Sequence, residues 1–306
     1  MNILFAGSPK SSSRILESLA NLKSVNIVGV LTKPDKRGKR GTKLHESEVA
    51  KTAAQFNLKI FKPESINEVN FKAGIQCLNL DLMVVVAYGE LIPNWLLSFP
   101  KIMCLNVHFS LLPEYRGASP IQSSLLNGDS ETGISFMQMT ERLDEGGLIS
   151  TNSISIKDND NKISVEERLT DLTIENMESV FDMLKNKDAI IINQDNSKAS
   201  YCKKIHKEDS ITDFNDSAIN ILNKFKAYFE WPGLSFIFKG VEIKIHEILV
   251  TSQKSTGAFG TINKVSKSGL YFNTGDYIIV ITYLQFPNKQ KISSLDVFNS
   301  YKSFFS

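Results

Sequence analysis

Short apolar runs alternate with amphipathic stretches along the first part of the chain. Strands are predicted where apolar, often β-branched residues cluster, and helices where apolar residues recur with helical spacing. The predicted strands are 2–6, 25–31, 58–61, 81–87, 102–108, 133–139 and 148–156, and the predicted helices are 12–22, 47–56, 120–127 and 165–184. This alternation is typical of a doubly wound, mostly parallel sheet, so we predict a Rossmann-like α/β fold.

The remainder of the chain has a different pattern. After a polar stretch at 185–206, a helix is predicted at 218–229, and short strands follow at 234–238, 241–250, 259–265, 269–273 and 277–284. Short strands separated by glycine turns are typical of a small barrel, and we expect a C-terminal β-barrel of OB-like size. The expected organisation is an α/β domain over 1–187, a linker over 188–206 and the barrel over 207–306.

Composition excludes several classes of protein. The chain has 306 residues, of which 42% are hydrophobic and 22% charged, as in ordinary globular proteins. Its three cysteines, Cys77, Cys104 and Cys202, form no CxxC pair, so neither a disulfide framework nor a zinc site is expected. No signal-peptide pattern and no apolar run of roughly 20 residues is seen, so we expect a cytoplasmic protein without a membrane partner.

Positive charge is concentrated in two places. Residues 32–45 carry six basic side chains and two glycines without apolar periodicity, which predicts an exposed loop. Residues 203–306 carry 13 Lys and Arg against 9 Asp and Glu. Both regions suit a polyanionic partner, and the loop's position after a strand favours phosphate contacts. For residues 203–306, charge alone fits a solvated surface equally well.

Candidate chemistry gathers where strands end. Asn106 and His108 end the predicted strand 102–108, and residues two apart in a strand point to the same face. Asp144 follows the next strand, ahead of two glycines. No GxSxG nucleophile motif or HExxH metal motif is present. An amide, an imidazole and a carboxylate suit an oxyanion site with proton transfer, which indicates acyl transfer to an external amine without a covalent enzyme intermediate.

Several motifs follow one another in the order of a known family. They are AGSP at 6–9, KRGKRGTKL at 36–44, VVVAYG at 84–89, NVHFSLLP at 106–113, RGASPIQ at 116–122, ETGISFMQM at 131–139, YCKKIHKED at 201–209 and EWPG at 230–233. Over nearly its whole length the chain resembles the 10-formyltetrahydrofolate-dependent formyltransferases. The resemblance is strongest to the branch that acts on methionyl initiator tRNA.

The resemblance implies roles for individual residues. Asn106 and His108 would stabilise the oxyanion on the formyl carbon, and Asp144 would orient or charge His108 and help to take the proton from the attacking amine. Two segments would bind 10-formyltetrahydrofolate, without a metal. They are Ser110, Leu111, Leu112 and Pro113, and, through backbone groups, Val86, Tyr88, Gly89 and Leu91.

The acceptor implied by the resemblance is the α-amino group of charged initiator tRNA. Its acceptor end would lie against the basic loop, and the barrel would hold its body through backbone and shape. The loop residues concerned are Lys36, Arg37, Lys39, Arg40 and Lys43. We expect the protein to be a monomer.

Three alternatives remain at this point. A formyltransferase acting on a small amine, such as an amino sugar or glycinamide ribonucleotide, would share Asn106, His108 and Asp144 but would not need the basic regions. A formyltetrahydrofolate hydrolase would use water in place of the amine. A non-catalytic RNA-binding protein would account for the charge but not for the three polar residues.

Overall fold

The computed structural model describes residues 1–37 and 44–306, so Lys39, Arg40 and Lys43 lie outside the described residues. The chain forms two compact units. The first comprises residues 1–120, 131–155 and 166–203, and the second comprises residues 121–130, 156–165 and 204–306. Each unit is described by itself below.

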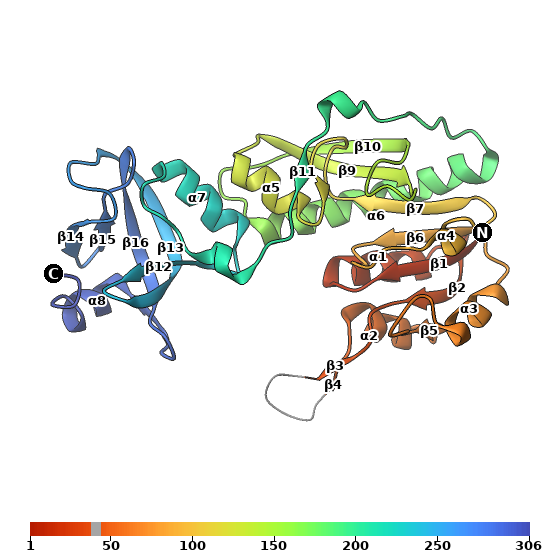
Figure 1. Cartoon of the computed structure of the whole chain (residues 1–306), viewed down its shortest axis with the longest axis horizontal. Helices are drawn as coiled ribbons and strands as arrows, with labels where there is room; N and C mark the ends of the chain where they lie inside the picture. The colour runs from red at the N-terminus through yellow and green to blue at the C-terminus, as the bar shows by residue number, and fades with distance from the viewer. Residues whose placement is uncertain (38–43) are drawn as a thin grey trace. The chain divides into compact units, whose positions relative to one another are not determined.

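The first unit is built on a seven-stranded sheet with the order β10-β9-β7-β6-β1-β2-β5 (Figure 1). Its strands are β1 (Asn2–Gly7), β2 (Asn26–Leu31), β5 (Ile60–Phe61), β6 (Leu82–Val86), β7 (Met103–His108), β9 (Glu131–Gln138) and β10 (Leu148–Ser155). The first five pair in parallel, and β9 and β10 are antiparallel additions beside β7. Strand order reverses between β1 and β6, which is the switch point where such sheets bind ligands.

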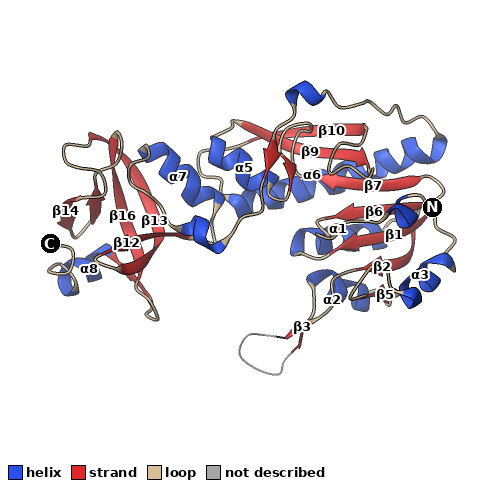
Figure 2. Cartoon of the chain, in the orientation of Figure 1, coloured by secondary structure: helices blue, strands red, loops and turns tan. Residues whose placement is uncertain are grey.

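Both faces of this sheet are covered. Leu4 and Ala6 of β1 lie in a buried cluster with Phe71 and with Leu96. The alternate residues of β1 are fully buried as well, as expected of a strand covered on both faces. The helices with residues in this unit are α1 (Lys10–Ala20), α2 (Glu48–Gln55), α3 (Val69–Gln76), α4 (Asn94–Leu97) and the greater part of α6 (Lys162–Asn186) (Figure 2). The predicted doubly wound α/β fold is confirmed.

None of the helices in the described parts of the chain, 1–37 and 44–306, is long and apolar enough to cross a membrane.

The second unit contains an antiparallel sheet with the order β12-β13-β16-β15-β14, with β17 paired to β16. Its elements are α7 (Ala218–Ala227), β12 (Leu234–Phe238), β13 (Val241–Lys254), β14 (Ile262–Ser266), β15 (Gly269–Phe272), β16 (Tyr277–Gln285), β17 (Lys291–Ser293) and α8 (Ser294–Ser300). Helix α5 (Pro120–Asn127) also lies largely in this unit. The predicted small C-terminal β domain is confirmed, with an antiparallel sheet, although no pairing in the described residues joins β12 to β14 to close the predicted barrel.

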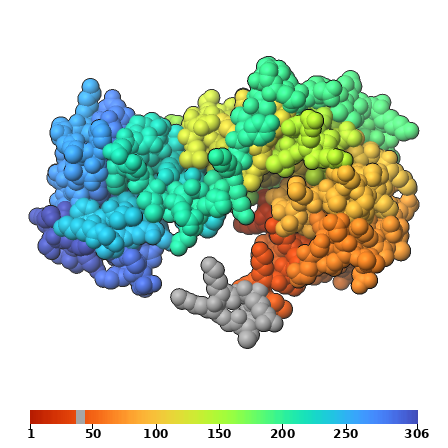
Figure 3. Space-filling view, viewed as in Figure 1, coloured from red at the N-terminus to blue at the C-terminus, as the bar shows by residue number. Residues whose placement is uncertain are grey.

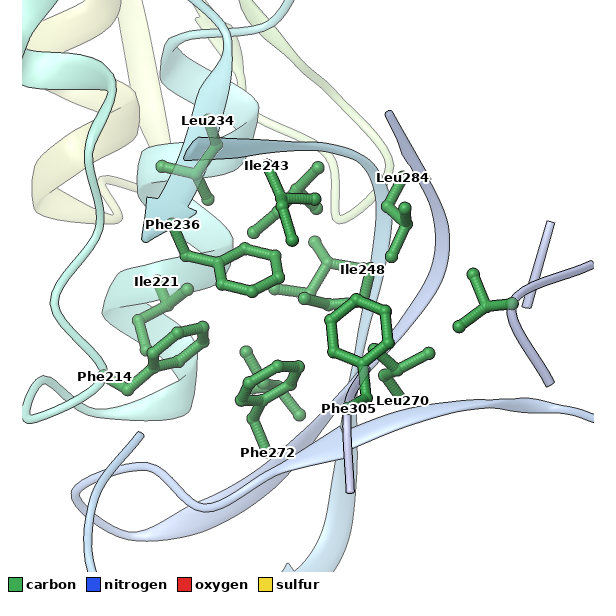
Figure 4. Close-up of a cluster of buried hydrophobic side chains, with 14 of the residues drawn as sticks. Phe214, Ile221, Leu234, Phe236, Ile243, Ile248, Leu270, Phe272, Leu284 and Phe305 are labelled. Atoms are coloured by element: carbon green, nitrogen blue, oxygen red, sulfur yellow. The ribbon is translucent and has the colours of Figure 1, made fainter. Parts of the chain in front are cut away.

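A cluster of buried hydrophobic side chains, both aliphatic and aromatic, forms the core of the second unit (Figure 4). Phe214 stacks on Phe272 with ring centroids 4.7 Å apart, and Phe236 meets Phe272 edge to face at 5.2 Å. Helix α7 contributes Ile221 to this cluster. Aromatic pairs of these kinds stabilise a core beyond their area burial.

The basic region begins and ends in regular structure. Residues 36–37 (β3) and 44–45 (β4) pair as an antiparallel ladder, where the sequence predicted an irregular loop. Lys62 Nζ binds Asp35 Oδ1 at 2.7 Å and Glu46 Oε1 at 2.8 Å, one residue outside each short strand. Although burial lowers it, the hydrogen bonds to Asp35 and Glu46 raise the pKa of Lys62 above its ordinary value. Lys62 therefore holds the two arms of this hairpin together.

The segment after α6 also differs from its predicted form. Residues 188–203 belong to the first unit, where the sequence predicted a linker over 188–206. Ile192 exchanges two backbone hydrogen bonds with Leu148, and β11 (Tyr201–Cys202) pairs in parallel with β8 (Arg116–Gly117). Figures 1 and 3 show this segment, in green, running over the outside of the unit. Its polar side chains have partners in the unit, which a composition argument cannot reveal.

Candidate active site

Two of the expected site residues lie at the end of β7. Asn106 and His108 are 9% and 6% exposed, although both are polar. They occupy alternate positions of one strand and so share a face. Among the described residues we find no hydrogen bond to the Asn106 side chain, whose amide is therefore free to donate to a ligand. A nearly buried amide without a protein partner is costly unless a substrate or water binds it.

The imidazole of His108 lies between two oxygen atoms. Its Nε2 is 2.9 Å from the Tyr115 backbone oxygen, and its Nδ1 is 3.8 Å from Asp144 Oδ2. The first contact is a hydrogen bond. The second is close enough for an ion pair but too long for a hydrogen bond. Only the doubly protonated ring has an N–H directed to each oxygen, whereas the neutral ring can donate to just one.

The position of Asp144 is fixed by its own turn. The residue has φ +53, in the left-handed region, and Gly146 packs so closely that a Cβ would lie 1.6 Å from the Gln138 backbone oxygen. The backbone N–H of Gly117 donates to Asp144 Oδ2 at 2.8 Å. The same carboxylate oxygen therefore faces His108 and is held from the other side.

Strand β8 holds both members of this pair. Tyr115, immediately before it, accepts from His108, and Gly117 within it donates to Asp144. The backbone of β8 is in turn bound by residues of the segment after α6, because Ser200 binds the N–H groups of Tyr115 and Arg116. The geometry can bind an oxyanion with a hydrogen bond from the Asn106 amide, and a protonated His108 ring beside the Asp144 carboxylate would add positive charge near it.

The loop after β6 offers backbone rather than side chains. Val86 and Tyr88 are buried, and the Val86 oxygen already accepts from Ser12 Oγ at 2.6 Å. Tyr88 packs in the hydrophobic cluster under the sheet, where burial raises its pKa to about 12. Gly89 has φ +78, and Leu91 is 80% exposed. This loop thus fits the expected use of backbone groups and excludes the Tyr88 ring as a ligand contact.

The second expected folate segment follows His108. Ser110 Oγ donates to the Glu114 backbone oxygen, and the Ser110 backbone oxygen accepts from Ser135 Oγ. Leu112 is buried, whereas Leu111 and Pro113 are partly exposed. Because the Ser110 hydroxyl already donates within the loop, this segment would contact a ligand mainly through Leu111 and Pro113.

Two residues that the sequence did not single out bind to the site. Arg116 is 1% exposed and binds the side-chain oxygens of Gln194 and Asn196, with Glu145 Oε1 at 3.6 Å from its Nη1. Gln194 also donates to the backbone oxygens of the Asp144 turn. Arg116 lies within a quoted motif and could have been noticed, but Gln194 sits in a polar stretch without any signal.

The predicted tRNA-binding residues lie only partly within the described structure. Lys36 is exposed on β3, the Arg37 side chain is not described, and Lys39, Arg40 and Lys43 lie outside the described residues. Their contact with an acceptor stays a prediction. Within residues 1–37 and 44–306, no group of three His, Cys, Asp or Glu side chains is arranged to hold a metal ion.

Comparison with known proteins gives two family matches. Residues 1–181 match the model described as "Formyl transferase", and residues 204–302 match "Formyl transferase, C-terminal domain".

Solved structures with the same fold share little sequence with the chain. WlaRD, a sugar 3N-formyl transferase solved in the presence of dTDP and 5-N-formyl-THF, is 18% identical (TM-score 0.67; 95% of this chain, 99% of WlaRD). The N-formyltransferase of Helicobacter canadensis, in complex with folinic acid and dTDP-3-aminofucose, is also 18% identical (TM-score 0.65; 91% and 98%). HypX from Aquifex aeolicus, solved with tetrahydrofolic acid, is 16% identical (TM-score 0.63), and the chain covers 47% of its length. The chain thus spans about half of HypX.

Proposed function

Because the chain belongs to the formyl transferase family, we propose that it transfers the formyl group of 10-formyltetrahydrofolate to a primary amine. The observation that carries this proposal is the meeting of His108 and Asp144 at 3.8 Å, with the Asn106 amide, which has no hydrogen bond within residues 1–37 and 44–306, on the same strand face as His108. His108 is the last residue of β7, at the carboxyl end of the parallel strands, where ligands of this fold class bind.

The proposed reaction assigns a task to each residue. The amine nitrogen bonds to the formyl carbon, and the carbonyl oxygen becomes an oxyanion that accepts from the Asn106 amide, while the nearby His108 ring, when protonated, stabilises it by its positive charge. Asp144 Oδ2 lies beside that ring, 3.8 Å from Nδ1. The bond from the formyl carbon to the folate nitrogen then breaks with its electron pair, and the proton lost by the amine ends on that nitrogen. Each oxyanion donor in such a site contributes about 3 kcal/mol to transition-state binding.

The formyl donor, a reduced folate, would bind at two segments of the first unit. The loop after β6 presents backbone groups at Ala87 and Gly89, and both residues are exposed. Leu111 and Pro113 supply apolar surface next to His108. Solved relatives hold tetrahydrofolate or folinic acid, which supports a reduced folate as the formyl donor here.

The acceptor has two candidates. The first is the α-amino group of methionyl initiator tRNA, supported by the basic segment at 36–45 and by the excess of basic residues over 203–306. The second is a small amine such as an amino sugar, which is favoured by the solved relatives because WlaRD is a sugar 3N-formyl transferase and the Helicobacter canadensis enzyme was solved with dTDP-3-aminofucose. Because these relatives are only 18% identical to the chain, their similarity shows a shared fold and not a shared acceptor.

One assay separates the two candidates. The protein is incubated with radiolabelled 10-formyltetrahydrofolate and, separately, with charged initiator tRNA, charged elongator tRNA and a dTDP-linked amino sugar. Transfer to initiator tRNA alone establishes the first candidate, and transfer to the sugar alone establishes the second. His108→Ala should abolish either transfer while folate binding persists. Release of formate in every reaction, without any labelled acceptor, would refute formyl transfer.

The basic hairpin gives a second test of the tRNA candidate. The variant neutralises Lys36, Arg37, Lys39 and Arg40, and the control neutralises four other lysines, Lys10, Lys23, Lys185 and Lys187. The hairpin variant should raise KM for tRNA and leave folate binding unchanged. The slope of log kcat/KM against log salt concentration should become less steep by about 0.7 to 0.9 for each phosphate contact that is lost. Equal effects in the control variant would show that only overall charge matters.

A further inference from the structure

The turn that carries Asp144 is held by a residue fifty positions later in the chain. Gln194 Nε2 donates to the backbone oxygens of Asp144 and of Gly146, each at 2.8 Å. Both carbonyls lie on the carboxyl side of the left-handed bend at Asp144. A single amide group therefore holds the backbone that directly follows the Cα of the residue whose carboxylate faces His108.

The other end of the same amide binds Arg116. Gln194 Oε1 accepts from Arg116 Nε at 3.0 Å and from Nη2 at 2.7 Å. Arg116 precedes Gly117, whose N–H donates to the Asp144 carboxylate. The contacts thus form a closed ring from the Asp144 backbone through Gln194, Arg116 and Gly117 to the Asp144 carboxylate.

Arg116 also determines which way the amide points. A guanidinium has only donors, so the atom of Gln194 that faces it must be the oxygen. The NH2 group then necessarily faces the two carbonyls, which are acceptors only. With Arg116 almost fully buried, a reversed amide would leave donors facing donors and acceptors facing acceptors at both ends.

We propose that Gln194 is a positioning residue that sets the distance and direction of the Asp144 carboxylate relative to His108. This inference rests on the proposed formyl transfer, and it holds for either acceptor. Gln194 lies well outside the motifs that carry the family resemblance, within the segment that composition marks as a linker. It touches no reacting atom in this role and acts only through Asp144.

The test compares three substitutions at one position with a nearby control. Gln194→Ala removes both halves of the amide contact. Gln194→Glu keeps an acceptor for Arg116 but loses the donors to the two carbonyls, and Gln194→Met keeps the volume alone. The control is Ser197→Ala, which removes a hydrogen bond to Asp195 on the same segment. We expect all three Gln194 variants to lower kcat about 10- to 100-fold, the usual effect of misplacing a group by about 1 Å, with unchanged KM.

Two readouts separate positioning from a general loss of structure. In an Asp144→Asn background, Gln194→Ala should lower kcat no further, because the carboxylate that it positions is already gone. Independently of activity, NMR resonances of the His108 ring, identified by their loss in His108→Ala, should move in Gln194→Ala in the same direction as in Asp144→Asn.

The inference is overturned if Gln194→Ala keeps its kcat, or if its effect multiplies fully with that of Asp144→Asn. A wild-type protein that transfers no formyl group to any acceptor refutes the proposed function instead. The NMR comparison then still decides the role of Gln194, because unmoved His108 resonances in Gln194→Ala would show that Asp144 does not depend on it.

Discussion

Replacing Asp144 by asparagine tests the pairing at the centre of the proposed reaction. Asparagine has the same shape, and its side-chain oxygen can still accept from the Gly117 N–H. The substitution removes one negative charge 3.8 Å from His108 Nδ1, where the two side chains are 9% and 7% exposed. At an effective dielectric constant of about 20, two unit charges at this separation attract by about 4 kcal/mol.

This energy bounds the expected loss of rate. If the imidazolium is needed in the transition state, losing about 2 to 4 kcal/mol lowers kcat about 30- to 1,000-fold. The assay is formyl transfer at saturating donor and acceptor, with folate affinity measured separately. Glu141→Gln is the matched control, because Glu141 lies in the same loop but binds Asn94. It should retain wild-type turnover.

A double substitution decides whether the pair acts as one unit. His108→Ala alone and His108→Ala with Asp144→Asn should be equally slow, since the carboxylate acts only through the ring. Fully multiplicative losses would show that Asp144 and His108 act separately. A kcat within threefold of wild type in Asp144→Asn alone would contradict the charge argument as a whole.

Two further predictions concern stability. The Asn2 backbone N–H donates to Asp81 and, together with Lys101, lowers the pKa of its carboxyl group. Asp81→Asn should therefore cost about 1 kcal/mol of unfolding free energy at pH 7. That difference should vanish as the pH falls below about 4 through the lowered pKa. Urea unfolding at several pH values measures it, and a difference that grows in acid would contradict the assignment. Phe272→Ala should cost about 3 to 5 kcal/mol, because the ring is fully buried, stacks on Phe214 and meets Phe236 edge to face. A loss under about 1 kcal/mol in a urea titration would show that the aromatic cluster does not stabilise the second unit.

The sequence predicts elements best where local pattern and burial agree. After Asp81, the predicted strand 81–87 is apolar throughout, and it forms β6 (Leu82–Val86), buried along its whole length. The two-residue strands β3 and β4 were missed because pairs this short carry no periodicity. Helix α8 was also missed, although Ser293 and Asp296 form a capping box that marks its start.

The candidate site likewise contains residues that the sequence predicts and partners that it does not. Asn106 and His108 follow from strand alternation, and Asp144 follows from its place in the resemblance. The partners that fix their geometry do not follow, because each is a backbone group or an amide from a distant segment. Gln194 lies in a polar stretch whose composition fits a linker equally well. The pairing of β11 with β8 and of Ile192 with Leu148 brings that stretch onto the unit, and neither pairing is visible in the sequence.

The buried Arg116 explains why this support is polar. Removing a guanidinium from water costs several kcal/mol, and its partners here are mostly neutral oxygens, so an apolar side chain of similar size would serve folding at least as well. An apolar side chain could not, however, fix the direction of the Gln194 amide. In the proposed reaction the carboxylate of Asp144 must face the His108 ring. A support built from directional hydrogen bonds fixes its direction more closely than apolar packing does. The cost of burying Arg116 is therefore consistent with a role in the site and hard to account for by stability.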